Sequence, residues 1–165
     1  MFGRRCSKNS CRVHAYGEVD ELSAALSLAL TLGLSTGVAE VTAAVQERLV
    51  ALMGELATLP EDAPEYSRRG YASLSPADVE WLEAHAHALE QQAGISFHGW
   101  VRPGVAAPPG AAALELARAV CRRAERAVLA LHEQQPLPNA ALRIFLNRLS
   151  DYLWLASRFE TTTPS

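Results

Sequence analysis

The sequence predicts an all-α protein, a five-helix bundle in one domain that spans residues 1–165. Five stretches carry apolar residues at a period of about 3.6 residues, and none shows the alternation or the Val, Ile and Thr clustering that is typical of a strand. The chain has 49 % hydrophobic and 20 % charged residues, which excludes a disordered or rod-like protein. Connections between the stretches are mostly short, which favours a bundle.

The first two helices lie in the N-terminal part of the chain. Residues 1–17 form a leading segment, and the first helix is expected from about Val19 to Leu32. The second is expected from about Val38 to Thr58, where apolar residues recur along one side. Pro60 ends it, because proline cannot continue a helix. The polar residues 61–70 predict a loop.

Three further helices follow. The third is predicted over about residues 76–93, because Ser75 supplies an N-cap and the next residue is a proline, which is favoured at the first helical position. Residues 94–110 contain three prolines and four glycines, which excludes a long helix and predicts a structured loop. The fourth and fifth helices are expected over about residues 111–135 and 140–159.

Charge and composition exclude several classes of partner and point to others. The formal net charge is -3, so we expect neither nucleic acid nor a membrane surface as a partner. Lys8 is the only lysine among fifteen basic residues, and the arginines that make up the rest grip phosphates and carboxylates in a bidentate fork. The three cysteines are an odd number without zinc spacing, and no apolar run is long enough to span a membrane. We therefore expect a cytoplasmic protein.

The sequence predicts no metal site. His85 and His87 lie two residues apart on the predicted third helix, so their side chains point in nearly opposite directions. The other histidines lack acidic residues at ligand spacing. No complete phosphate-binding loop, dinucleotide fingerprint or protease motif is present either.

Charged side chains gather on one face of the predicted fourth helix. At about 100° per residue, Arg118, Arg122, Glu125 and Glu115 share this face, and Leu116 belongs to the apolar residues expected opposite it. One interpretation is a solvated charged surface. The other is a site for an anionic ligand or a partner's carboxylate, because four arginines within nine residues repel one another.

Two other predicted helices carry polar residues of interest. On the first helix, Asp20 lies among small polar residues. We expect this side to be covered and Asp20 to pair with an arginine of the fourth helix, or else Asp20 only favours the helix dipole. On the fifth helix, Asn147 and Asp151 lie one turn apart beside Trp154. This arrangement suits a nucleoside or sugar, and it equally suits a helix surface.

Three blocks of the sequence resemble the PduO-type ATP:cob(I)alamin adenosyltransferases. KNSCRVHAYGEVDEL at residues 8–22 is similar to KDSxRVEAYGTVDEL of that family. ARAVCRRAER at residues 117–126 is similar to ARxVCRRAER, and LNRLSDYL at residues 146–153 is similar to LNRLSDFL. Because the three blocks occur in the same order, the chain is identified as a member of that family.

The resemblance implies a reaction and an assembly. It implies that the protein moves the 5′-deoxyadenosyl group of ATP, supplied with Mg²⁺, to cob(I)alamin, giving adenosylcobalamin and triphosphate. Cob(II)alamin would be bound without its lower axial ligand, which makes its reduction to cob(I)alamin accessible. The protein would form a homotrimer with each active site at a subunit boundary. A reductase and a B12-dependent enzyme are implied as further partners.

The resemblance also assigns catalytic and ATP-binding residues. Lys8, Arg118 and Arg122 would stabilise the polyphosphate. Asp20 would pair with Arg118 across the interface, and Glu125 would order the arginines or the nucleoside.

Four more residues are assigned to the two ligands. Asn147 and Asp151 would bind the nucleoside side of the ATP pocket. Trp100 takes the place of the family's phenylalanine that expels the lower axial ligand of cobalamin, with Phe97 as the alternative wall.

Two departures from the family pattern leave a second interpretation open. The family's TGDxGxT loop, which cradles the triphosphate, is absent from the sequence, where only Gly3, Arg4 and Arg5 resemble its end. Glu115 stands where the family has histidine, and we expect it to compete with phosphate for Arg118 or Arg122. The alternative is a catalytically degenerate relative that binds a corrinoid, nucleotide or tetrapyrrole-like ligand as carrier or sensor.

Overall fold

The computed structural model describes residues 7–93 and 107–162, and all regular structure in these two ranges is helical. The elements are α1 (Cys11–Thr31), α2 (Thr36–Ala57), the 3-10 turn η1 (Pro60–Asp62), α3 (Ala63–Arg68), α4 (Pro76–Ala93), α5 (Pro109–Gln134) and α6 (Ala141–Thr162). The all-α prediction is confirmed, and the short helix α3 is added to the five helices that were expected.

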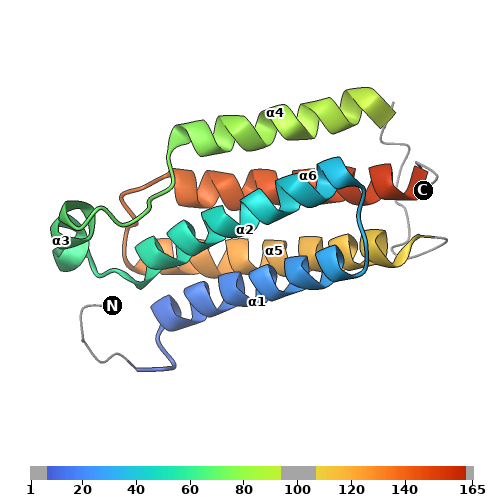
Figure 1. The fold of residues 1–165 in the computed structure, drawn as a ribbon. Coiled ribbons are helices and arrows are strands. Elements are labelled where there is room, and N and C mark those ends of the chain that lie inside the picture. Colours follow the sequence, from blue (N-terminus) through green and yellow to red (C-terminus); the bar gives the residue numbers. More distant parts are fainter. Residues whose placement is uncertain (1–6, 94–106, 163–165) are drawn as a thin grey trace.

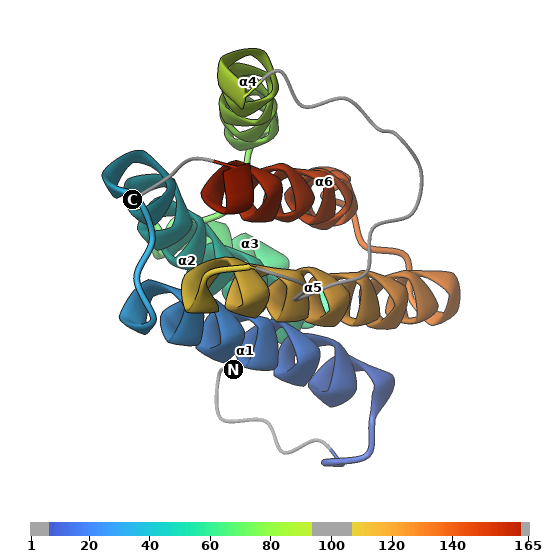
Figure 2. The same ribbon diagram turned by 90° about the vertical axis from the view of Figure 1, so that its right-hand side faces the viewer.

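Helix α5 lies in the middle of the bundle. It packs against α1 on one flank and against α6 on the other. Helix α2 packs along α1, and α4 covers the side of α6 that faces away from α1 (Figures 1 and 2). Leu22, Leu49, Leu114 and Leu146 are fully buried between these helices. Each such leucine contributes about 2 kcal/mol, so the apolar period that predicts the helices also holds them together.

Helix α1 begins at Cys11, well before the predicted start at Val19. Ser10 caps it, because its side-chain oxygen accepts a hydrogen bond from the Val13 N–H at 3.3 Å. The additional turns place Arg12 on the buried side of the helix. A charged residue on that side interrupts the apolar period, which is why the sequence predicts a later start.

Helix α3 falls inside the stretch that the sequence predicts as a loop. It lies at the end of the bundle where α2 ends (Figure 1) and has one buried residue, Tyr66. The Tyr66 hydroxyl donates a hydrogen bond to the Ala72 carbonyl at 2.6 Å. A single apolar residue cannot show a period, so the sequence signals for this helix were only the proline and the acid of its first turn, Pro64 and Glu65.

Helix α5 begins at Pro109, so the last two residues of the predicted loop 94–110 belong to its first turn. Gly110 is buried there and packs directly against the backbone of Gly33, in the turn that joins α1 to α2. None of the helices in the described ranges combines the length and the apolar character of a membrane-spanning helix.

Candidate functional site

The four arginines near the middle of α5 lie in different environments. Arg118 is partly buried and ion-paired with a carboxylate of its own helix, and Arg123 is ion-paired with two carboxylates of α1. Arg122 and Arg126 are exposed and form no ion pair with any other described residue. The repulsion expected from the sequence is therefore relieved inside the chain for two arginines, and the other two remain available to an anion or a partner.

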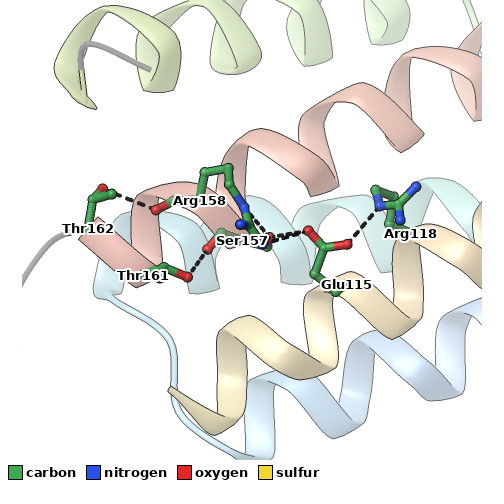
Figure 3. A network of polar contacts seen from close by, with 6 residues as sticks. All are labelled: Glu115, Arg118, Ser157, Arg158, Thr161 and Thr162. Atoms are coloured by element: carbon green, nitrogen blue, oxygen red, sulfur yellow. Dashed lines mark hydrogen bonds and ion pairs between the residues drawn. The ribbon is translucent and has the colours of Figure 1, made fainter. Parts of the chain in front are cut away.

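Glu115 links Arg118 to helix α6 (Figure 3). Its side chain is only 6 % exposed. Oε2 accepts a hydrogen bond from Nε of Arg118 at 2.9 Å. Oε1 accepts hydrogen bonds from Oγ of Ser157 at 2.7 Å and from Nη2 of Arg158 at 2.9 Å. The expected contact of Glu115 with the arginine face is confirmed for Arg118 and not found for Arg122 within the described part of the chain.

Two opposing effects act on the pKa of Glu115. Burial raises it, because a charged carboxylate loses its hydration. The hydrogen bonds from Ser157 and Arg118, together with the positive charges of Arg118 and Arg158, outweigh burial and lower the pKa below its ordinary value. Glu115 is therefore an anion at neutral pH, held between two cations.

Glu125 and Asn147 connect α5 to α6 further along the bundle. Nδ2 of Asn147 donates a hydrogen bond to Oε1 of Glu125 at 2.9 Å. Helices α5 and α6 are antiparallel: moving from Glu115 to Glu125 along α5 corresponds to moving back from Ser157 to Asn147 along α6. Glu115, Arg118 and Glu125 thus form one polar stripe along the α6 flank of α5, which we call the α5 stripe.

Asp151 does not share the partner of Asn147. Its carboxylate lies 3.7 Å from Nη1 of Arg148, which is also ion-paired with Glu83 of α4. These three residues line a groove between α4 and α6 with a volume of about 270 Å³. Asn147 and Asp151 are both exposed, but in this chain they contact different neighbours.

The residues predicted on the α1 side lie apart from the α5 stripe. Lys8 is exposed and lines a groove of about 530 Å³ between the start of α1 and the second half of α5, together with Glu18 and Glu21. Both glutamates are ion-paired with Arg123. Asp20 is exposed and forms no ion pair with another described residue, so its expected pairing with an arginine stays a prediction.

Arg12, which belongs to the first family-like block, has a structural role. It is 7 % exposed and donates hydrogen bonds to the Leu56 and Thr58 carbonyls at the end of α2 and to the Gln135 side chain after α5. It also lines a cavity of about 140 Å³ at that end of the bundle. None of the predicted site residues that the structure describes lines this cavity.

Phe97 and Trp100, predicted to contact cobalamin, lie outside the described residues. Residues 7–93 and 107–162 hold no group of three or more His, Cys, Asp or Glu side chains that could bind a metal ion. Cys121 is fully buried within the second family-like block, and burial raises the pKa of its thiol despite the nearby Arg122. This thiol is therefore held in its neutral form.

Sequence comparisons give the same family over nearly the whole chain. The family model for cobalamin adenosyltransferase matches residues 1–160. The corrinoid adenosyltransferase of Bacillus subtilis is 35 % identical, over 96 % of this chain and 78 % of that protein. The cobalamin adenosyltransferase of Cupriavidus metallidurans is 37 % identical, over 94 % of this chain and 78 % of that protein.

Solved structures agree with this result. A variant of the PduO-type ATP:corrinoid adenosyltransferase from Lactobacillus reuteri, complexed with cobalamin and ATP, is 30 % identical with a TM-score of 0.85. The match covers 98 % of this chain and 86 % of that one. Another variant of the same enzyme, complexed with ATP, is 31 % identical with a TM-score of 0.83, over 98 % of this chain and 86 % of that one. With the helical bundle and arginine-bearing α5 described above, these matches show that the chain belongs to the cobalamin adenosyltransferase family.

Proposed function

We propose that this protein is an ATP:corrinoid adenosyltransferase, which moves the 5′-deoxyadenosyl group of ATP to cob(I)alamin. The observation that carries the proposal is the pair of arginines on α5: Arg122 is exposed without an ion pair among the described residues, and Arg118 is partly exposed one turn before it. In the reaction the cobalt–carbon bond forms as the bond from C5′ to the triphosphate oxygen breaks. Negative charge grows on that oxygen, so permanent cations beside it favour the transition state.

Residues of the α5 stripe and its neighbours bind different parts of ATP. Arg118 and Arg122 bind the triphosphate oxygens, and ATP arrives with Mg²⁺. Glu125 of α5 and Asn147 of α6, already hydrogen-bonded to each other, offer polar groups to the nucleoside. Asp151, one turn after Asn147 on α6, extends this side of the pocket. Since triphosphate leaves as an anion, the reaction needs no general base, and positioning and charge are what the protein supplies.

The corrinoid side of the proposed site rests on the two aromatic residues of the 94–110 segment. Trp100, with Phe97 as the second wall, would form an apolar surface that excludes water and the lower axial ligand of cobalamin. A reductase would supply the electron for cob(I)alamin, and a B12-dependent enzyme would receive the product.

We infer further that the site is completed by a second copy of the chain, in a homotrimer. Lys8 lies on the α1 flank of α5 and Asn147 on the α6 flank, so a single subunit does not bring these two predicted ATP ligands together. Asp20 is exposed and available to Arg118 of a neighbouring copy. Leu28 on α1 and Leu116 on α5 are 45 % and 53 % exposed, which favours a partner surface over water.

The direct test is adenosylation by the purified protein. The protein is mixed anaerobically with ATP, Mg²⁺ and cob(I)alamin made by a chemical reductant. We expect the absorption spectrum of adenosylcobalamin to appear together with one triphosphate per adenosylcobalamin formed. Binding of cobalamin or of ATP without any product would contradict an enzyme and would favour the alternative function, a carrier or sensor of the bound ligand.

A further inference from the structure

We propose that Glu115 is a positioning residue, which fixes the guanidinium of Arg118 through Nε so that its terminal nitrogens stay free for the triphosphate and for Asp20 of a neighbouring copy. The inference rests on the proposed function, because it assumes that Arg118 binds the polyphosphate. It assigns to Glu115 the opposite effect to the competition with phosphate that the sequence predicts.

The two carboxylate oxygens of Glu115 have separate tasks. Oε1 is anchored on α6 by Ser157 and Arg158, and Oε2 is left to receive Nε of Arg118 (Figure 3). Ser157 is fully buried, so the anchor is shielded from water. The carboxylate is thereby held in one orientation, and Arg118 is held through the nitrogen nearest its aliphatic chain.

The hydrogen bond through Nε leaves the terminal nitrogens of Arg118, Nη1 and Nη2, available to a ligand. Nη1 and Nη2 of Arg118 form no hydrogen bond with another described residue, and the side chain is 27 % exposed. A guanidinium grips two phosphate oxygens with a pair of parallel N–H groups, and Nη1 with Nη2 can supply such a pair. An arginine already fixed in this way loses less rotamer freedom on binding than a free one.

The charges of the Glu115 cluster also favour binding of an anion beside Arg118. Arg158 is 14 % exposed and Arg118 is 27 % exposed, and between them lies a single carboxylate. Within one subunit, one negative charge does not neutralise two positive ones, so the cluster keeps a net positive charge that attracts anions. Arg118 is the more exposed of the two cations, so an anionic ligand reaches the cluster from its side.

If Glu115 only tied α5 to α6, two variants that each weaken this tie would have the same effect on phosphate binding. Two variants therefore separate the structural role from the positioning role. Glu115→Gln keeps the shape but replaces one acceptor oxygen with an N–H donor and removes the charge. Ser157→Ala is the matched control, because it removes a hydrogen bond from Oε1 and leaves Oε2 and Arg118 in place. Both variants lose an α5–α6 contact, and only the first disturbs Arg118.

The probe is inorganic tripolyphosphate, with binding measured by titration calorimetry on the full chain. We expect Glu115→Gln to raise the dissociation constant about tenfold and Ser157→Ala to leave it within about twofold. With ATP and cob(I)alamin, Glu115→Gln raises KM for ATP, whereas Ser157→Ala lowers only the melting temperature. If Glu115→Gln does not fold, Glu115→Asp, which keeps the charge and shortens the reach, replaces it with the same expectation.

A double-mutant cycle with Arg118→Lys decides whether Glu115 acts through Arg118. Lysine keeps the positive charge and lacks Nε, so in this background Glu115→Gln has little further effect on tripolyphosphate binding. Fully additive effects, or equal affinity of wild type and Glu115→Gln, would overturn the inference. If the wild type binds tripolyphosphate and the variants behave as expected but no adenosylcobalamin forms, the proposed function fails and the role of Glu115 stands.

Discussion

Arg122 meets solvent on the outer face of α5, with no carboxylate of the described chain to neutralise it. We predict that Arg122→Ala lowers kcat/KM for adenosylation by about 100-fold or more, because one preorganised donor to a developing anion contributes about 3 kcal/mol. The matched control is Arg126→Ala, an arginine one turn further on that is also exposed and without an ion pair among the described residues. Steady-state kinetics with ATP measures both variants, and equal losses would indicate a general effect of positive charge.

Arg12 acts on stability rather than on chemistry. Its guanidinium joins the start of α1 to the end of α2 through the Leu56 and Thr58 carbonyls, the latter at 2.9 Å. Arg12→Ala leaves these acceptors without their charged donor, and we expect the free energy of unfolding to fall by about 2–3 kcal/mol. Urea denaturation gives the value, and Arg126→Ala, whose only polar contact in the described chain is with the Arg122 carbonyl, should change it by less than about 0.5 kcal/mol.

The partners of individual residues were the hardest part to predict from the sequence. Glu115 and Arg118 are three apart on one helix, so their contact follows from helix geometry. Ser157 and Arg158 were missed as partners of Glu115, because an apolar period specifies which face is buried and not how far one helix is shifted along another. The pairing of Asp20 stays a prediction for a related reason: its expected partner belongs to a second subunit.

The first turn of α5 depends on a close contact between backbones. A Cβ atom at Gly110 would lie 1.9 Å from the carbonyl oxygen of Gly33, which itself has a φ of 93°. We predict that Gly110→Ala forces α5 away from the α1–α2 turn and lowers the free energy of unfolding by at least about 1–3 kcal/mol. Thermal or urea unfolding measures the loss.

Gly17 provides the comparison for that experiment. It lies inside α1, and a Cβ built on it meets nothing within 4 Å. Gly17→Ala should therefore stabilise the protein by up to about 1 kcal/mol, since alanine is the better helix former. A destabilisation of similar size in both variants would contradict the role given to the Gly110 contact.

The long helices were predictable because each buries a regular apolar side, and their exact ends were not. The start of α1 was missed because Arg12 is buried where an apolar residue is expected, and α3 was missed because Tyr66 alone gives no period. Leu116 was expected on the apolar side of α5, opposite the charged face, and is 53 % exposed. It lies toward the outer face of α5, which a single subunit does not cover.

The assembly can be tested through Asp20. We predict that Asp20→Asn raises the dissociation constant of the proposed trimer about tenfold or more, because the expected contact with Arg118 of the neighbouring subunit loses its negative charge. Sedimentation velocity over a range of protein concentrations measures the shift, and adenosylation should fall in parallel. Glu47→Gln, which removes one charge from an exposed position on α2, is the control. Unchanged sedimentation and unchanged kinetics in Asp20→Asn would rule out this contact.

The antiparallel stagger of α5 and α6 restricts how the molecule can respond to a substrate. Hydrogen bonds fix the position of α6 along α5 near both ends of the α5 stripe, from Ser157 to Glu115 and from Asn147 to Glu125. A slide of one helix along the other by a single turn, about 5.4 Å, would break both hydrogen bonds at once. These two contacts therefore oppose a slide of α6 along α5 when a ligand binds.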